Sequence, residues 1–157
     1  MVSEDDLYLK RAEEKVLLAK TCFEISTKSE IKTFLGLAQN QTFFNDIISL
    51  SYYSVFYSAK AYLISKGVKT QPPEEHKKTY DEFAKFVKMG ILDKELLDIY
   101  ENAALEAETL LNIFLIEKKN RGRYTYNVNA NANMPFAKDS IENTKKFTRT
   151  ITAILKR

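Results

Sequence analysis

Residues 49–67 read SLSYYSVFYSAKAYLISKG, and this stretch decides the fold. It lies largely within residues 41–66, the most apolar segment of the chain. That segment holds seven of the nineteen aromatic residues. Small Ser and Ala residues alternate with the large rings, a composition that lets neighbouring helices pack closely. Gly67 stands where a glycine is expected just after a helix ends. The pattern predicts a central helix over 41–66 that is buried on more than one side.

Helical periodicity continues on both sides of this segment. Apolar residues spaced by three and four positions predict four more helices, over 4–27, 74–88, 93–119 and 136–156. Ser3 followed by Asp6 resembles the capping box that begins a helix. Residues 29–38 are expected to form a short helical turn or a loop. Two consecutive prolines place a linker at 68–75, and an Asn-rich stretch predicts a break at 120–136.

The fold class follows from these elements. The chain has 157 residues, a length typical of one domain, with only four Gly and three Pro. A β-sandwich or barrel needs more turns than that composition provides, and no useful segment shows strict strand alternation. We therefore predict an all-α fold, an up-and-down four-helix bundle with an additional short helix, in a single domain over 1–157.

Composition also excludes several classes of protein and site. One Cys and one His exclude a disulfide framework and a zinc finger, so neither a metal nor another cofactor is expected. Cys22, beside the apolar stripe of the first helix, is interpreted as structural. No apolar run approaches the roughly 18 residues that span a bilayer, and residues 2–6 are not those of a signal peptide. A cytoplasmic protein without a membrane partner is expected.

The net charge of +3 conceals an uneven distribution. Residues 117–157 contain ten Lys or Arg and three acidic residues, a net charge of +7, whereas residues 1–116 carry 14 basic and 18 acidic residues, a net charge of −4. Such asymmetry is typical of a surface that faces a polyanion, although Lys-rich helices can also simply be soluble.

The segment 117–126, EKKNRGRYTY, concentrates this positive charge beside two tyrosines. Arg suits phosphate and an aromatic ring suits a base, so the segment is a candidate nucleotide- or RNA-binding site. Routine capping of a helix C-terminus by basic residues, with both rings packed on the end of the bundle, is the alternative. The candidate binding residues are Lys118, Lys119, Arg121, Arg123 and Tyr124.

His76 has two possible roles, a capping or packing residue or a catalytic one. It follows Pro-Pro-Glu-Glu near the start of a predicted short helix. The packing role is favoured, and an ion pair with the neighbouring Glu75 would raise the pKa of the imidazole. Common enzyme motifs, including a Gly-rich phosphate loop, H-E-x-x-H and G-x-S-x-G, do not occur in the sequence.

Three segments of the chain carry recognisable motifs. Residues 49–67 contain a Tyr-Tyr-x-x-Phe-x-x-Ala-Lys pattern, formed by Tyr52, Tyr53, Phe56, Ala59 and Lys60. Residues 74–96 contain a His-Lys segment and a Gly-x-Leu-Asp turn, and residues 121–126 form a late polar motif. In this order the motifs resemble those of the HEPN domain family, the higher-eukaryote and prokaryote nucleotide-binding domains. The similarity covers roughly residues 42–155.

The resemblance implies a homodimer that acts on RNA or nucleotides. HEPN ribonucleases carry Arg-x4–6-His and cleave RNA without metal: the Arg holds the scissile phosphate and the His moves a proton. Here Arg121 is followed after four residues by Tyr126, an Arg-x4-Tyr variant. A tyrosine with an ordinary pKa near 10 is a poor base at pH 7. Arg121 and Tyr126 are therefore candidate catalytic residues of, at best, a weak metal-independent ribonuclease.

Two other functions stay open. The resemblance implies that the RNA- or nucleotide-binding module belongs to a toxin–antitoxin-like or nucleotidyltransferase-associated system. In the first alternative, the chain is instead a non-catalytic subunit that docks a minimal nucleotidyltransferase. Tyr124 or Tyr126 would then be the nucleotidylated group. In the second, the chain is a helical interaction protein with no nucleotide ligand.

Overall fold

The computed structural model describes residues 1–99, 107–127 and 131–156, which form seven helices and no β-strand. Four of the helices have at least 20 residues and three are short. They are α1 (Glu4–Thr27), α2 (Ser29–Phe34), α3 (Phe44–Ser65), α4 (Glu75–Lys88), α5 (Ile91–Ile99), α6 (Ala107–Tyr126) and α7 (Met134–Leu155).

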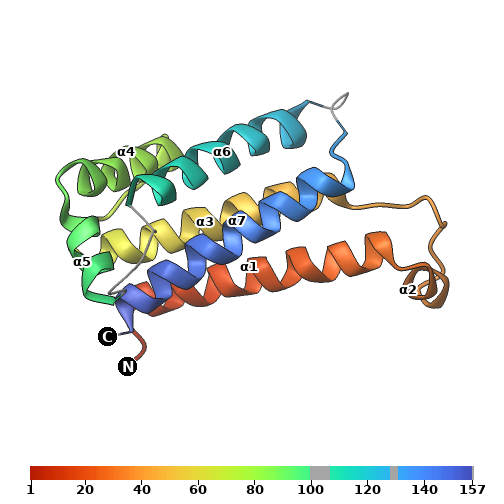
Figure 1. The fold of residues 1–157 in the computed structure, drawn as a ribbon, viewed down its shortest axis with the longest axis horizontal. Helices are drawn as coiled ribbons and strands as arrows, with labels where there is room; N and C mark the ends of the chain where they lie inside the picture. Colours follow the sequence, from red (N-terminus) through yellow and green to blue (C-terminus); the bar gives the residue numbers. More distant parts are fainter. Residues whose placement is uncertain (100–106, 128–130, 157) are drawn as a thin grey trace.

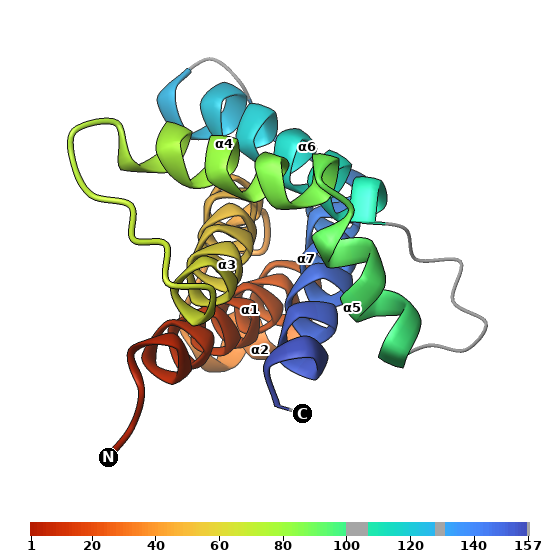
Figure 2. The same ribbon diagram turned by 90° about the vertical axis from the view of Figure 1, so that its left-hand side faces the viewer.

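The four long helices form an up-and-down bundle, which confirms the predicted fold class. Along the chain, α1, α3, α6 and α7 run in alternating directions, and the two termini lie at the same end (Figure 1). The short helix α4 lies beside α6, over α3 (Figure 2). The described part of the chain has three short helices, α2, α4 and α5, where the periodicity predicted one and left 29–38 open.

Helix α3 is the central element, as its composition predicted. It contacts α1, α4, α6 and α7, and thirteen of its 22 residues are buried, too many for a helix with one covered face. Its small residues allow close approach: Ser54 Oγ donates a hydrogen bond to the carbonyl oxygen of Ala12 on α1 (2.7 Å), and Ser58 Oγ donates to Thr148 Oγ1 on α7 (3.0 Å). The largest rings of the core pack around them: Tyr52, Tyr62, Phe83, Phe114 and Phe147.

The predicted helix ends are largely confirmed. Ser3 Oγ accepts a hydrogen bond from the backbone N–H of Asp6 at 3.3 Å and begins α1. Gly67, just after α3, has φ of 78°, a left-handed conformation that glycine adopts without strain. Helix α7 begins at Met134, two residues before the predicted start, because Asn133 Oδ1 accepts from the N–H of Phe136 and caps it.

One predicted helix is wrong. The segment 93–119 was expected to be continuous, but it contains two helices, α5 and α6, which contact each other and point in different directions (Figure 2). Residues 100–106 lie outside the described residues. The apolar stripe has the same period before and after this segment, and a period carries no information on a change of direction.

The predicted break at 120–136 is also partly wrong, because α6 continues to Tyr126. Gly122 costs about 1 kcal/mol in a helix relative to Ala, but packing can override such a propensity. Here the ring of Tyr124, only 5% exposed, packs against Phe136 at the start of α7. The basic segment 117–126 therefore lies on the last turns of a helix.

Candidate functional site

Arg121, on α6, is the centre of the candidate site. Its Nη2 donates a hydrogen bond to the hydroxyl of Tyr53 on α3 at 3.1 Å. The guanidinium carbon lies 4.9 Å from the ring centroid of Tyr52 and 5.1 Å from that of Tyr53. Both distances are within the range of a cation–π interaction. The fold thus brings together the Tyr-Tyr pair and the late polar motif, which are far apart in the sequence.

His76, on the first turn of α4, joins this cluster. Its Nδ1 is hydrogen-bonded to the hydroxyl of Tyr52 at 2.8 Å, and its ring lies 4.2 Å from that of Phe56, centroid to centroid. The edge of Tyr53 is also near, with a centroid distance of 5.7 Å. Tyr52 therefore contacts both the imidazole of His76 and the guanidinium of Arg121. The site lies where α3, α4 and α6 pack on one another (Figure 2).

The surroundings keep His76 neutral near pH 7. Burial lowers the pKa of its imidazole, and the positive charge of Arg121 lowers it further, with smaller contributions from Lys118 and Lys60. Glu75 acts in the opposite direction but does not prevail. The effect of Glu75 is thus in the expected direction, but the net shift of the pKa is downward. The reason is that the Glu75 carboxylate forms an ion pair with Lys60, while burial and the surrounding cations act against it.

Two lysines flank the cluster and have different roles. Lys118 Nζ lies 4.9 Å from the ring centroid of Tyr80, and its half-buried side chain is on the same face of α6 as Arg121. Lys60 is only 5% exposed; its ammonium pairs with Glu75 and lies 4.6 Å from the ring centroid of Tyr8. Lys60 thus anchors the start of α4 to α3, whereas Lys118 adds positive charge at the site.

Glu117 adds less negative charge than an ordinary carboxylate. Its side chain is fully buried between α6 and α7, and Asn143 Nδ2 donates to its Oε1 at 3.3 Å. Burial raises the pKa of this carboxyl group to about 7. Near neutral pH it is therefore protonated far more often than an ordinary carboxyl group, so it only partly offsets Arg121, one helical turn away.

The other predicted binding residues lie apart from this cluster. Lys119 and Arg123 are exposed, and the guanidinium carbon of Arg123 lies 5.2 Å from the ring centroid of Tyr124. Tyr124 is buried against Phe136, which favours the packing interpretation of this ring. The side chain of Tyr126 lies outside the described part of the structure. Of the predicted residues, the fold gathers Arg121 and Lys118 around His76.

Cys22 has the properties of a structural cysteine. It is half-buried and packs against the small apolar cluster formed by α1, α3 and α7. Burial, with a smaller contribution from Asp46, raises the pKa of its thiol. A raised pKa makes the thiolate scarce at neutral pH, so the side chain is a poor nucleophile.

His76 was expected to have a packing role, and no local pattern in the sequence indicates that it lies beside Arg121. The available signal was the order of motifs in the resemblance, in which a His-Lys segment follows the Tyr-Tyr pattern. The order of motifs points to His76 but does not show which residues lie next to it. The contact depends on how the linker 68–75 returns α4 to α3, which a local pattern does not encode.

The cluster combines a guanidinium, an ammonium and a neutral imidazole on an aromatic base. The first two suit a phosphate, and the third can donate a hydrogen bond or exchange a proton. Among residues 1–99, 107–127 and 131–156, no three His, Cys, Asp or Glu side chains are grouped so that they could hold a metal ion. None of the helices described is long and apolar enough to cross a membrane.

Comparison with known proteins gives no further identification: no family model, no curated protein and no solved structure matches this chain.

Proposed function

We propose that the chain is a HEPN-like module that binds RNA or a nucleotide through a phosphate contact with Arg121. The observation that carries the proposal is the fixed position of its guanidinium, which is hydrogen-bonded to Tyr53 and lies over Tyr52, beside His76. Holding Arg in place before binding reduces the side-chain entropy that binding would otherwise cost. Its planar fork suits two phosphate oxygens, which a flexible lysine does not match.

The neighbouring residues extend the proposed binding surface. Lys118 would contact the same or an adjacent phosphate, since it shares a helix face with Arg121. The exposed Lys119 and Arg123 would add less specific attraction for the polyanion. The imidazole N–H of His76 would donate to a phosphate oxygen or a ribose hydroxyl.

The position of His76 favours weak metal-independent ribonuclease activity as a second candidate function. A neutral imidazole beside a phosphate-holding Arg121 could accept the proton of a ribose 2′-hydroxyl. The 2′-oxygen would then bond to phosphorus as the P–O5′ bond breaks. The leaving 5′-oxygen would take a proton from water, and the resulting hydroxide would take the proton from the imidazolium. The products would be a 2′,3′-cyclic phosphate and a 5′-hydroxyl, formed in the presence of EDTA and lost in both Arg121→Ala and His76→Ala.

Binding is tested first, by titrating a fluorescein-labelled single-stranded RNA at low salt. We expect Arg121→Ala to bind about tenfold or more weakly, with its helical circular dichroism retained and its Tm lowered by only a few degrees. Arg149→Ala, which removes an exposed arginine of α7 outside the α3–α4–α6 site, is the matched control and should bind like the wild type. Equal RNA affinity of Arg121→Ala and wild type would overturn the proposal.

In the alternative function, a subunit that docks a minimal nucleotidyltransferase, one tyrosine hydroxyl must be accessible to that enzyme. Tyr124 is 5% exposed and its ring packs on Phe136, which limits access to this residue. Tyr126 is therefore the acceptor that we propose. Intact-mass measurement of the protein co-expressed with a minimal nucleotidyltransferase tests this, with Tyr126→Phe and Tyr124→Phe compared. The homodimer implied by the resemblance is tested by sedimentation equilibrium.

A further inference from the structure

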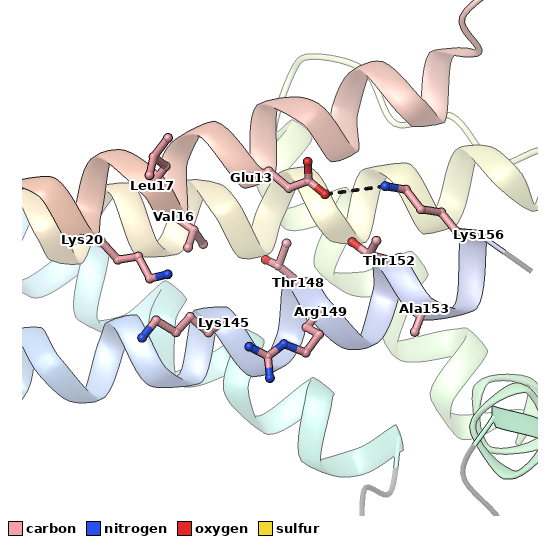
Figure 3. Close-up of a pocket in the computed structure, with 10 residues that line it drawn as sticks. All are labelled: Glu13, Val16, Leu17, Lys20, Lys145, Thr148, Arg149, Thr152, Ala153 and Lys156. Atoms are coloured by element: carbon pink, nitrogen blue, oxygen red, sulfur yellow. Dashed lines mark ion pairs between the residues drawn. The ribbon is translucent and has the colours of Figure 1, made fainter.

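A groove between α1 and α7 lies apart from the candidate site, which α3, α4 and α6 form. Its volume is about 520 Å³. Figure 3 shows Val16 and Thr148 between the two helices, with Leu17 on the α1 rim and Arg149 on the α7 rim. The ten residues that line the groove are Glu13, Val16, Leu17, Lys20, Lys145, Thr148, Arg149, Thr152, Ala153 and Lys156.

The groove combines an apolar surface with positive charge. Leu17, a large apolar side chain on the rim of the groove, is 65% exposed. Four of the lining residues are cations and one is an acid, Glu13, which pairs with Lys156 at 4.0 Å. Lys20 and Lys145 approach each other at the opposite end of the groove (Figure 3). The groove therefore has an excess of positive charge along a partly apolar wall.

The cations are only partly compensated by the chain itself. Lys145 Nζ pairs with Glu142 at 2.8 Å, one turn earlier on α7. Among the described residues, neither Lys20 nor Arg149 has a carboxylate oxygen within 4.0 Å. A second hollow continues the groove past Lys20 and Lys145 and adds one cation, Lys138, and two acids, Glu24 and Glu142. The excess of positive charge is therefore confined to the groove itself, where four cations face one acid.

We propose that this groove binds an acidic amphipathic helix of a partner protein. Apolar side chains three and four positions apart would cover Val16 and Leu17, and carboxylates on both flanks would face Lys20 and Arg149. The lining of α1 from Glu13 to Lys20 extends over about 10 Å at 1.5 Å per residue. A partner helix of about three turns is long enough to occupy it.

The lining residues favour a helix over a nucleic acid. None of the ten has an aromatic ring on which a base could stack. A phosphate backbone would pair with the cations but would leave the exposed Leu17 against a polar ligand. An acidic amphipathic helix satisfies both properties at once, since it buries the leucine and neutralises the lysines.

A synthetic peptide of about 18 residues, with Leu spaced by three and four positions and Glu on both flanks, tests the proposal by fluorescence anisotropy. We expect Leu17→Glu and Arg149→Glu each to weaken binding about tenfold or more. Leu18→Glu, a leucine on α1 that is 47% exposed and does not line the groove, should change the affinity less than about twofold. Arg121→Ala should bind the peptide normally.

Control ligands show whether something other than an acidic helix occupies the groove. Absence of binding at about 1 mM peptide, or equal binding of a peptide with Lys in place of Glu, would overturn the proposal. So would displacement of the peptide by single-stranded RNA that Arg149→Glu no longer binds, which would make the groove a nucleic-acid surface. A dimer in sedimentation that Leu17→Glu dissociates would assign the groove to a second copy of the chain and would also overturn it.

Discussion

Arg121 on α6 donates a hydrogen bond to the hydroxyl of Tyr53 on α3, and its guanidinium carbon lies 5.1 Å from the centroid of the same ring. One tyrosine thus fixes the arginine both by its polar end and by its aromatic face. A long side chain at the end of a helix would otherwise sample many rotamers. The contact links the fold to the proposed function, because the position of the guanidinium depends on the packing of α6 against α3.

Tyr53→Phe should distinguish the hydrogen bond to the Tyr53 hydroxyl from the cation–π contact with its ring. The variant keeps the ring but removes the hydroxyl, so we expect the free energy of unfolding to fall by about 1 kcal/mol. RNA binding should weaken by about three- to tenfold, because Arg121 loses one of its positional restraints. Fluorescence titration and urea unfolding measure the two effects. Tyr57→Phe, a half-buried tyrosine one turn later on α3, is the control, and an equal loss of RNA affinity there would contradict the argument.

His76 gives an internal reporter of the site, since it is the single histidine of the chain. Burial and the cations around it lower the pKa of its imidazole below the ordinary 6.5, so an NMR titration should give a midpoint under that value. Arg121→Ala should raise this midpoint, because a positive neighbour is removed, and Glu75→Gln should lower it. A midpoint that Arg121→Ala leaves unchanged would show that the guanidinium and the imidazole do not interact.

The lowered pKa of His76 also determines how the free energy of unfolding changes with pH. As pH falls through 6.5, the unfolded chain takes up a proton at His76 that the folded chain does not. The free energy of unfolding should therefore decrease from pH 6.5 down to the lowered folded-state pKa, with no contribution from this group above pH 6.5. Urea unfolding of wild type and His76→Gln across pH 5 to 8 isolates this part of the slope.

The helical framework could be predicted from sequence because its information is local. The stripe of α1, the Ser3 cap and Gly67 after α3 are each contained within a few neighbouring residues. The different directions of α5 and α6 could not be predicted, since the apolar residues keep the same spacing in both segments. The extension of α6 past Gly122 depends on Tyr124 packing against Phe136, a contact with another helix.

The candidate site could be predicted only in part for the same reason. Arg121 and Lys118 were identified because basic residues and tyrosines are concentrated in ten positions. The meeting of His76 with Tyr52 depends on the return of α4 against α3. That return is held by the pair of Lys60 and Glu75, whose partners cannot be assigned from a local pattern.

The Lys60–Glu75 pair should carry much of the stability of this arrangement. Lys60 is 5% exposed, so Glu75→Gln would leave an ammonium buried with less compensation. We expect the free energy of unfolding to fall by about 3 kcal/mol. Glu82→Gln, which breaks an exposed pair with Lys85 on the same helix, is the control and should cost less than about 1 kcal/mol. Similar costs for both variants in urea unfolding would contradict the buried role of Lys60.

Glu117 should make the protein more stable in mild acid than at high pH. Its folded-state pKa is raised to about 7, above the ordinary 4.5, so the folded chain keeps a proton that the unfolded chain loses between these values. The contribution of this group is therefore fully present below pH 4.5 and is lost as pH rises through 7, opposite in sign to that of His76.

Glu117→Gln removes this titration while keeping an oxygen that can accept from Asn143 Nδ2. We expect the variant to be more stable than wild type at pH 8 by about 3 kcal/mol, and nearly equal to it at pH 4.5. Urea unfolding at the two pH values measures the difference, with the exposed Glu14→Gln as control. If Glu117→Gln were destabilising at pH 8, the buried carboxylate would instead be stabilised as an anion, and it would offset the positive charge of Arg121 one turn away.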